Sequence, residues 1–163
     1  MKNKFNSSIL FVITLLIFIF SSNSSVLSEV DKGYAVIVNS KVQSDGVSFE
    51  ELRKILTGEK QFWSGGQRIT IILPPLDSPE GKTVLKEVYD KSEAQYRRYW
   101  IAKVFRAEIP TAPNVVKSTK TALKIVKSVE GSISIINTSD LTNDVKVLAI
   151  NNLKPGQGGY PLH

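Results

Sequence analysis

A short polar turn at residues 76–83 carries the side chains of this sequence that are best suited to hold a small anion. The candidate ligand-binding residues are Asp77, Ser78, Gly81, Lys82 and Thr83. Hydroxyl and backbone N–H groups donate hydrogen bonds to an oxyanion, and an ammonium group adds opposite charge. The turn therefore predicts a small-anion site. The alternative stays open, because every unit that joins a strand to a helix has such a turn and most of them bind nothing.

A strand before the turn and a helix after it would hold these residues in place. The run Ile69, Ile71, Ile72 and Leu73 is apolar and rich in β-branched side chains, which is typical of a strand inside a sheet, and Pro74 and Pro75 end that strand. Either Asp77 or Ser78 can cap the following helix. The helix start then directs backbone N–H groups and the positive end of the helix dipole toward the turn.

The helix after the turn has its own local signals. Pro79 suits the first helical position, and Glu80 lies three residues after Asp77, where a capping box needs it. The apolar stripe of the helix consists of Val84, Leu85, Val88 and Tyr89. We therefore expect one continuous strand–turn–helix unit.

Few residues could support catalysis or bind a metal. The sequence has no cysteine and its one histidine is the terminal His163, which argues against a catalytic triad of the usual kind and against a zinc site. Residues 81–83 match the end of the phosphate-binding loop GxxxxGK[ST], but Leu76 stands where its first glycine belongs. The sequence therefore predicts a protein that is not an enzyme and that has no cofactor.

The N-terminus has the pattern of a secretory signal peptide. Lys2 and Lys4 precede an apolar run at residues 9–20, which is shorter than the roughly 20 residues that a membrane-spanning helix needs. Small residues then allow cleavage near Ser28. We expect a signal peptide at 1–28 and one domain at 29–163 in the periplasm or outside the cell, with an uncleaved anchor as the alternative.

The net charge gives only a weak indication of the partner. The whole chain carries a formal charge of +6, of which the two lysines of the signal peptide contribute two. A mildly basic protein favours anionic ligands through its overall field. We expect no nucleic-acid partner, because an exported protein rarely meets nucleic acid.

The rest of the chain alternates strands with helices. Strands are expected at residues 34–39, 132–137 and 145–150, and helices after Ser48, Ser92 and Ser118. This order predicts an α/β fold with a mostly parallel or mixed sheet flanked by helices. In the helix after Ser92, a stripe predicted to face the core contains Tyr96, Tyr99, Trp100, Val104 and Phe105. The side chains predicted to face outward are those of Arg97, Arg98, Lys103 and Arg106.

Three short motifs follow one another along the chain: Ile55-Leu56-Thr57-Gly58 with Trp63, then Gly131-Ser132-Ile133-Ser134-Ile135, then Gly159-Tyr160-Pro161-Leu162. In this order they resemble motifs of the substrate-binding proteins of phosphate ABC transporters, which have the periplasmic binding protein type 2 fold. The resemblance implies a fold like one lobe of that family. It also implies phosphate or a similar small oxyanion as the ligand and a membrane transporter as the partner.

The sequence departs from the family where the ligand would bind. The family places an arginine at the strand end, where this chain has Pro74 and Pro75, and a Ser-Gly-Thr triplet at the helix start, of which Ser78 and Thr83 carry over. Glu80 would repel a phosphate and Lys82 would offset it. The glycine- and serine-rich anion loop of the first lobe has no counterpart, and the chain has about half the family's length.

Two functions therefore stay open. The first is an exported domain that binds phosphate or a similar small oxyanion in connection with ABC-type transport. The alternative is a periplasmic interaction or sensor-accessory protein that keeps the fold without tight ligand binding. The role of Trp63 is also open between a core residue and a gate at the pocket, with the core favoured.

Overall fold

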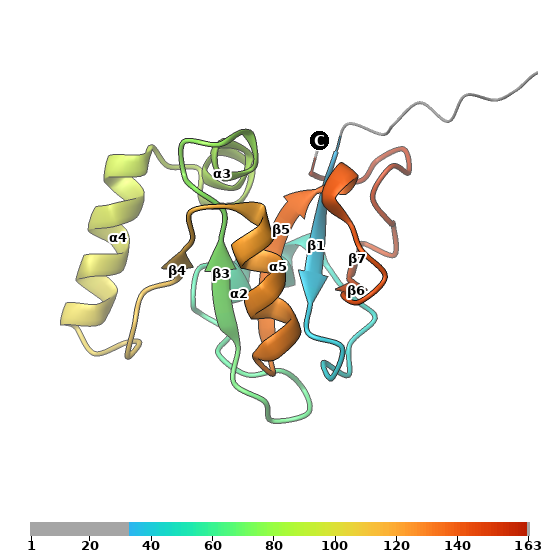
Figure 1. Cartoon of the computed structure of the whole chain (residues 1–163). Coiled ribbons are helices and arrows are strands. Elements are labelled where there is room, and N and C mark those ends of the chain that lie inside the picture. Colours follow the sequence, from blue (N-terminus) through green and yellow to red (C-terminus); the bar gives the residue numbers. More distant parts are fainter. Residues whose placement is uncertain (1–32, 163) are drawn as a thin grey trace, which may run out of the picture.

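A computed structural model describes residues 33–162 of the chain as a sheet packed between helices (Figure 1). The predicted signal peptide at 1–28 lies outside the described residues. The main sheet has five strands in the order β4-β3-β5-β1-β6. No helix within residues 33–162 is long and apolar enough to cross a membrane.

The main sheet is mixed. Strand β1 (Tyr34–Val38) pairs antiparallel with both β5 (Ser132–Asn137) and β6 (Lys146–Val147). Strand β3 (Thr70–Leu73) pairs parallel with both β5 and β4 (Asn114–Val115). The predicted fold class, a mostly parallel or mixed sheet flanked by helices, is confirmed.

The strand expected at residues 145–150 is divided between two sheets. Leu148 is fully buried, and its N–H donates to Val36 O of the main sheet at 2.9 Å, whereas the N–H of Ala149 donates to Asp45 O at 2.9 Å. The chain therefore leaves β6 and forms β7 (Ala149–Ile150), which pairs parallel with β2 (Gly46–Val47). The prediction of one continuous strand was wrong, because the change of partner depends on a distant segment.

The helices begin where the serines predict. Helices α2 (Phe49–Leu56), α4 (Glu93–Phe105) and α5 (Thr119–Ser128) are capped by Ser48, Ser92 and Ser118. At Ser92 the complete capping box is present, with Gln95 as the return partner. The helix after the predicted turn has two parts, α3 (Pro79–Thr83) and the π-helical η1 (Val84–Tyr89).

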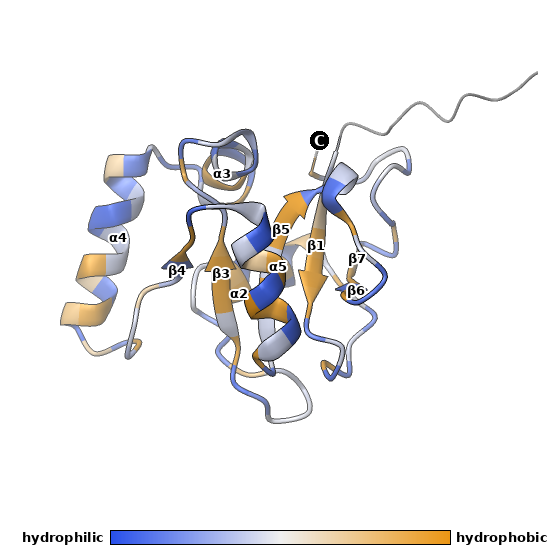
Figure 2. Ribbon diagram, viewed as in Figure 1, coloured by the Kyte–Doolittle hydropathy of each residue, from blue (hydrophilic) through white to orange (hydrophobic). Residues whose placement is uncertain are grey.

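The sheet has a core on each face because side chains alternate along its strands. Val36 and Val38 point into the larger core with α2, η1 and α4, while Ala35 and Ile37 point into a smaller core under α5. Figure 2 shows the apolar character of the strands between these helices. Trp63 is 4% exposed within the larger core, and its Nε1 donates to Gly131 O at 2.9 Å. The core interpretation of Trp63 is confirmed.

Helix α4 differs from its predicted orientation at its C-terminal end. Tyr96 and Trp100 face the core as expected, but Val104 is 39% exposed and Phe105 is 90% exposed. Lys103, expected outside, is buried, with its Nζ 5.3 Å from the Tyr99 ring centroid and 3.7 Å from Glu108 Oε2. The long stem of a lysine can cover apolar surface while its ammonium group reaches a partner.

Candidate functional site

The predicted turn lies where β3 ends and α3 begins. Figure 1 shows α3 beyond the end of β3. Ser78 is the N-cap, and its Oγ accepts a hydrogen bond from Gly81 N at 3.1 Å. The N–H of Lys82 donates to Ser78 O at 2.9 Å, and the N–H of Ser78 donates to Pro75 O at 3.0 Å. The capping box expected between Asp77 and Glu80 is therefore replaced by a cap at Ser78.

Gly81 has a packing role at this helix start. A Cβ atom built on Gly81 would lie 2.1 Å from Pro75 O and 2.6 Å from Leu76 Cα. Such distances are far below van der Waals contact, so only glycine lets the helix pack this closely on the turn. Two of the first N–H donors of the helix, those of Gly81 and Lys82, are also engaged with Ser78.

The other candidate residues lie around the helix start rather than in one cavity. Asp77 is exposed and lines one hollow, while Lys82 is exposed and lines another hollow beside Asp90. Thr83 is half-buried in the last turn of α3. The structure thus brings Ser78 and Gly81 together and places Asp77 and Lys82 on different sides.

The hollow beside Asp77 contains basic residues that the sequence did not indicate. Its other polar lining residues are Glu93, Arg97 and Lys117. Arg97 Nη2 lies 2.6 Å from Glu93 Oε1, so part of its charge is compensated. Arg97 and Lys117 come from α4 and from the segment after β4, and no local pattern links them to the turn. They supply positive charge next to the turn, which lacks the arginine that the resemblance implies at the strand end.

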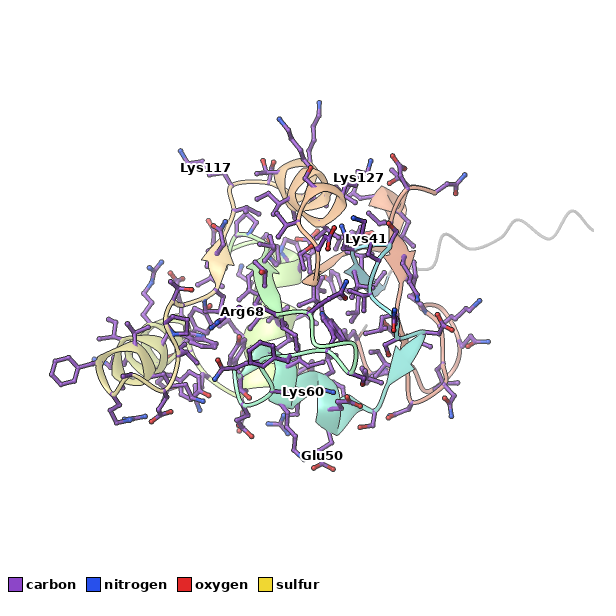
Figure 3. The ribbon with its side chains drawn as sticks, turned by 90° about the horizontal axis from the view of Figure 1, so that it is seen from below. Lys41, Glu50, Lys60, Arg68, Lys117 and Lys127 are labelled. Carbon is purple, nitrogen blue, oxygen red and sulfur yellow. The ribbon has the colours of Figure 1, made fainter. Side chains whose placement is uncertain are left out.

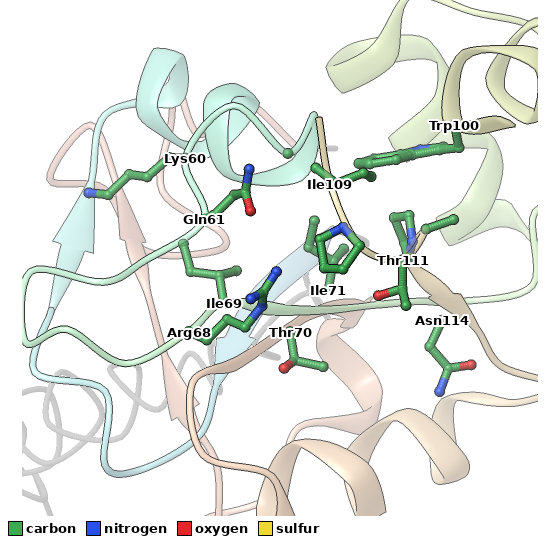
Figure 4. Close-up of a pocket in the computed structure, with 14 residues that line it drawn as sticks. Lys60, Gln61, Arg68, Ile69, Thr70, Ile71, Trp100, Ile109, Thr111 and Asn114 are labelled. Atoms are coloured by element: carbon green, nitrogen blue, oxygen red, sulfur yellow. The ribbon is translucent and has the colours of Figure 1, made fainter. Parts of the chain in front are cut away.

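A second, polar pocket lies at the opposite end of β3. It is a cavity of about 160 Å³ whose polar lining includes Arg68, Thr70, Thr111 and Asn114 (Figure 4). Arg68 Cζ lies 5.8 Å from the ring centroid of Phe62. Sequence reasoning missed this polar pocket because its walls come from separate parts of the chain, residues 58–71, Trp100 and residues 109–114.

Three of the lysine side chains that Figure 3 labels form ion pairs with acidic side chains. Figure 3 shows Lys41, Lys60, Arg68 and Lys127 from below, and in Figure 4 the Lys60 side chain points away from the polar pocket. Lys41 pairs with Glu130, Lys60 with Glu51, and Lys127 with Asp144. Arg68 has no ion pair with any residue in 33–162, so its charge is available to a ligand or partner.

No carboxylate or imidazole cluster suited to a metal ion is present in the described part of the chain. Residues 33–162 contain no group of three or more His, Cys, Asp or Glu side chains that could hold a metal.

Comparison with solved structures identifies the class of fold. The chain matches a substrate-binding protein assigned to a phosphate ABC transporter of Clostridium perfringens and solved with bound phosphate, with a TM-score of 0.62 and 15% identity over 76% of this chain and 47% of that one. It also matches an ABC-type phosphate transport receptor from Vibrio cholerae, with a TM-score of 0.60 and 16% identity over 76% of this chain and 48% of that one. These likenesses confirm the fold expected from the sequence motifs.

Comparison of sequences also finds a phosphate-binding protein as a relative. The chain is 30% identical over 140 residues to the phosphate-binding protein PstS of Bacillus subtilis (strain 168). This match covers 80% of the chain. The matched region spans only 41% of that relative. No protein-family model matches the chain. The resemblance to the substrate-binding proteins of phosphate ABC transporters is confirmed, over less than half the length of the relative.

Proposed function

We propose that this chain is an exported, non-enzymatic solute-binding domain that binds phosphate or a similar small oxyanion in connection with ABC-type transport. The observation that carries the proposal is the 30% identity over 140 residues to a protein named for phosphate binding. The retained strand–turn–helix unit supports it, because the dipole at a helix start favours anions.

The proposed ligand site is the turn at residues 76–83. Ser78 and Thr83 contribute hydroxyl donors, Gly81 lets the helix start pack on the turn, and Lys82 contributes positive charge. Asp77 is exposed and brings a negative charge that opposes the ligand. We expect modest affinity, because each charge-assisted hydrogen bond that is missing costs about 1.5–3 kcal/mol.

Calorimetric titration of the processed protein with phosphate at low salt tests this function, with sulfate as the control. We expect phosphate to bind saturably with a dissociation constant in the micromolar range. Sulfate is expected to bind more weakly. No heat, together with no thermal shift up to millimolar phosphate, would contradict oxyanion binding by this domain.

A double variant tests the site. Ser78→Ala with Thr83→Val removes the two hydroxyl groups and is expected to weaken phosphate binding at least about tenfold, since a hydrogen bond to a charged group is worth about 1.5–3 kcal/mol. Ser48→Ala is the matched control, because it removes the N-cap serine of α2, which lines a hollow that shares no residue with the turn. Unchanged affinity in the double variant would remove the turn from the mechanism.

A second candidate function is an interaction or sensor-accessory role without tight ligand binding. The observation that favours it is the large exposed apolar surface at the end of α4, where Ile101 is 69% exposed and Phe105 is 90% exposed. A neighbouring sensor kinase gene would support this role, whereas a neighbouring transporter operon would support uptake.

A further inference from the structure

An exposed apolar groove lies between the end of α4 and the segment that leads into β4. Its volume is about 710 Å³, and Trp100 lies in its wall. We call it the α4 groove and define it by Ile101, Val104, Phe105, residues 110–113 and Val115. Figure 2 shows the apolar character of the C-terminal half of α4.

The exposure of this groove exceeds what scattered surface residues would give. Ile101 and Phe105 lie one turn apart on α4 and are 69% and 90% exposed, and Val115 across the groove is 42% exposed. Single exposed apolar residues are normal, but a contiguous apolar patch around a hollow is typical of a binding surface. Helix α4 meets the core through Tyr96 and Trp100, whose side chains also form part of the wall of the groove.

The charge around the α4 groove is positive. Its only charged lining residue is Arg97, whose charge Glu93 partly compensates, and across the wall at residues 110–113 lies the polar pocket with Arg68. Neither hollow has an acidic side chain in its lining. Arg98, exposed on α4, and Arg68 have no ion pair with the described residues 33–162. A partner that covers this surface therefore meets uncompensated positive charge.

We propose that the α4 groove is a docking site for an acidic amphipathic segment of a protein partner. Apolar side chains of that segment enter the groove between Phe105 and Val115, and its carboxylates face Arg98 and Arg68. Amphipathic segments bind apolar grooves in this way, and complementary charge selects the partner and its orientation. A concave hollow suits the side chains of a protein segment better than the flat surface of a bilayer.

The inference rests on the second candidate function and is independent of phosphate binding at the turn. The groove and the turn at residues 76–83 share no residue. Phosphate titration and peptide binding are separate measurements, so the failure of one proposal leaves the other standing.

Selection from a displayed library of random peptides against the processed protein tests the docking site. We expect the enriched peptides to carry a net negative charge and large apolar residues at helical spacing. Their affinity is expected to fall at least about tenfold in the variant Ile101→Ser with Phe105→Ser, since a few buried anchor residues carry most of the binding energy of an interface. Both side chains are exposed, so the fold is expected to persist.

Two further variants make the test specific. Val129→Ser removes an apolar side chain that is 37% exposed outside the α4 groove, and peptide affinity is expected to stay unchanged. Arg68→Glu with Arg98→Glu is expected to weaken acidic peptides and to favour basic ones, because the charge complementarity is reversed.

Several outcomes would overturn the proposal. These are no enrichment, enrichment of neutral or basic peptides, or equal affinity for the protein and its Ile101→Ser, Phe105→Ser variant. Binding to phosphatidylglycerol vesicles that this double variant abolishes would assign the groove to a membrane surface instead. A dimer in solution that the same variant dissociates would assign it to a second copy of the chain.

Discussion

Gly81 joins the candidate turn to its helix through a contact that no other residue permits. An added Cβ atom would lie 2.1 Å from Pro75 O and 2.9 Å from Leu76 C, which are backbone atoms that cannot swing away as a flexible side chain would. The residue is buried, and its N–H donates to Ser78 Oγ. The position of Gly81 therefore determines both the cap and the close packing of the turn.

Replacing this glycine is expected to destabilise the fold. Gly81→Ala should lower the free energy of unfolding by about 1–3 kcal/mol, because overpacking forces a backbone shift that outweighs the gain in helix propensity. Urea denaturation measures the effect. Gly158→Ala is the matched control, since a Cβ atom there meets nothing within 4 Å, and it is expected to change stability little. Equal stability of the two variants would contradict the packing role.

At the scale of elements, helix α4 is fixed by its N-terminus and by an aromatic cluster. Ser92 Oγ accepts from Gln95 N at 3.3 Å, and Ser92 N donates to Gln95 Oε1 at 2.8 Å. The Tyr89 and Tyr96 rings meet edge to face with centroids 4.9 Å apart, and Trp100 adds to the same cluster. These contacts hold the N-terminal half of α4 and leave its C-terminal end outside the core.

Removal of the cap tests how far this helix depends on it. Ser92→Ala is expected to lower the free energy of unfolding by about 1 kcal/mol, because one backbone N–H of the first turn loses its acceptor. The measurement is urea denaturation, with Ser64→Ala in an exposed loop as the control. A Ser92→Ala protein as stable as the control would mean that the capping box contributes nothing measurable.

Local signals explain which elements the sequence could predict. The caps at Ser48, Ser92 and Ser118 depend on residues three positions away, so a short stretch contains all the information. The division of the strand at Leu148 depends on Val36, and the polar pocket depends on Arg68 and Thr111 lining one cavity. The exposure of Phe105 depends on the absence of a covering element within residues 33–162. None of these distant contacts leaves a local pattern.

At the scale of the whole molecule, the C-terminal segment closes the larger core. Tyr160 is 4% exposed and Leu162 is fully buried, both within that core. The N–H of Tyr34 in β1 donates to Leu162 O at 3.3 Å. The Tyr-Pro-Leu motif that supported the family resemblance therefore has a structural role, because it joins the end of the described chain to strand β1.

Burial of these tyrosines makes the stability of the whole fold sensitive to alkaline pH. Burial raises the pKa of Tyr160 from 10.0 to about 12, and burial also raises the pKa values of Tyr89 and Tyr96. Above pH 10 the unfolded chain loses these protons while the folded chain keeps them. The unfolded state then binds fewer protons, so the free energy of unfolding falls as the pH rises.

Tyr160→Phe isolates the contribution of one such group. Between pH 10 and about 12 the variant is expected to lose stability less steeply than the native protein, by about 1.4 kcal/mol per pH unit at most, because one of the protons is no longer released on unfolding. Below pH 9 its stability curve should run parallel to that of the native protein. Urea denaturation at a series of pH values measures both slopes. Identical slopes above pH 10 would show that Tyr160 ionises equally in the folded and unfolded chains, and that the C-terminal segment does not close the core.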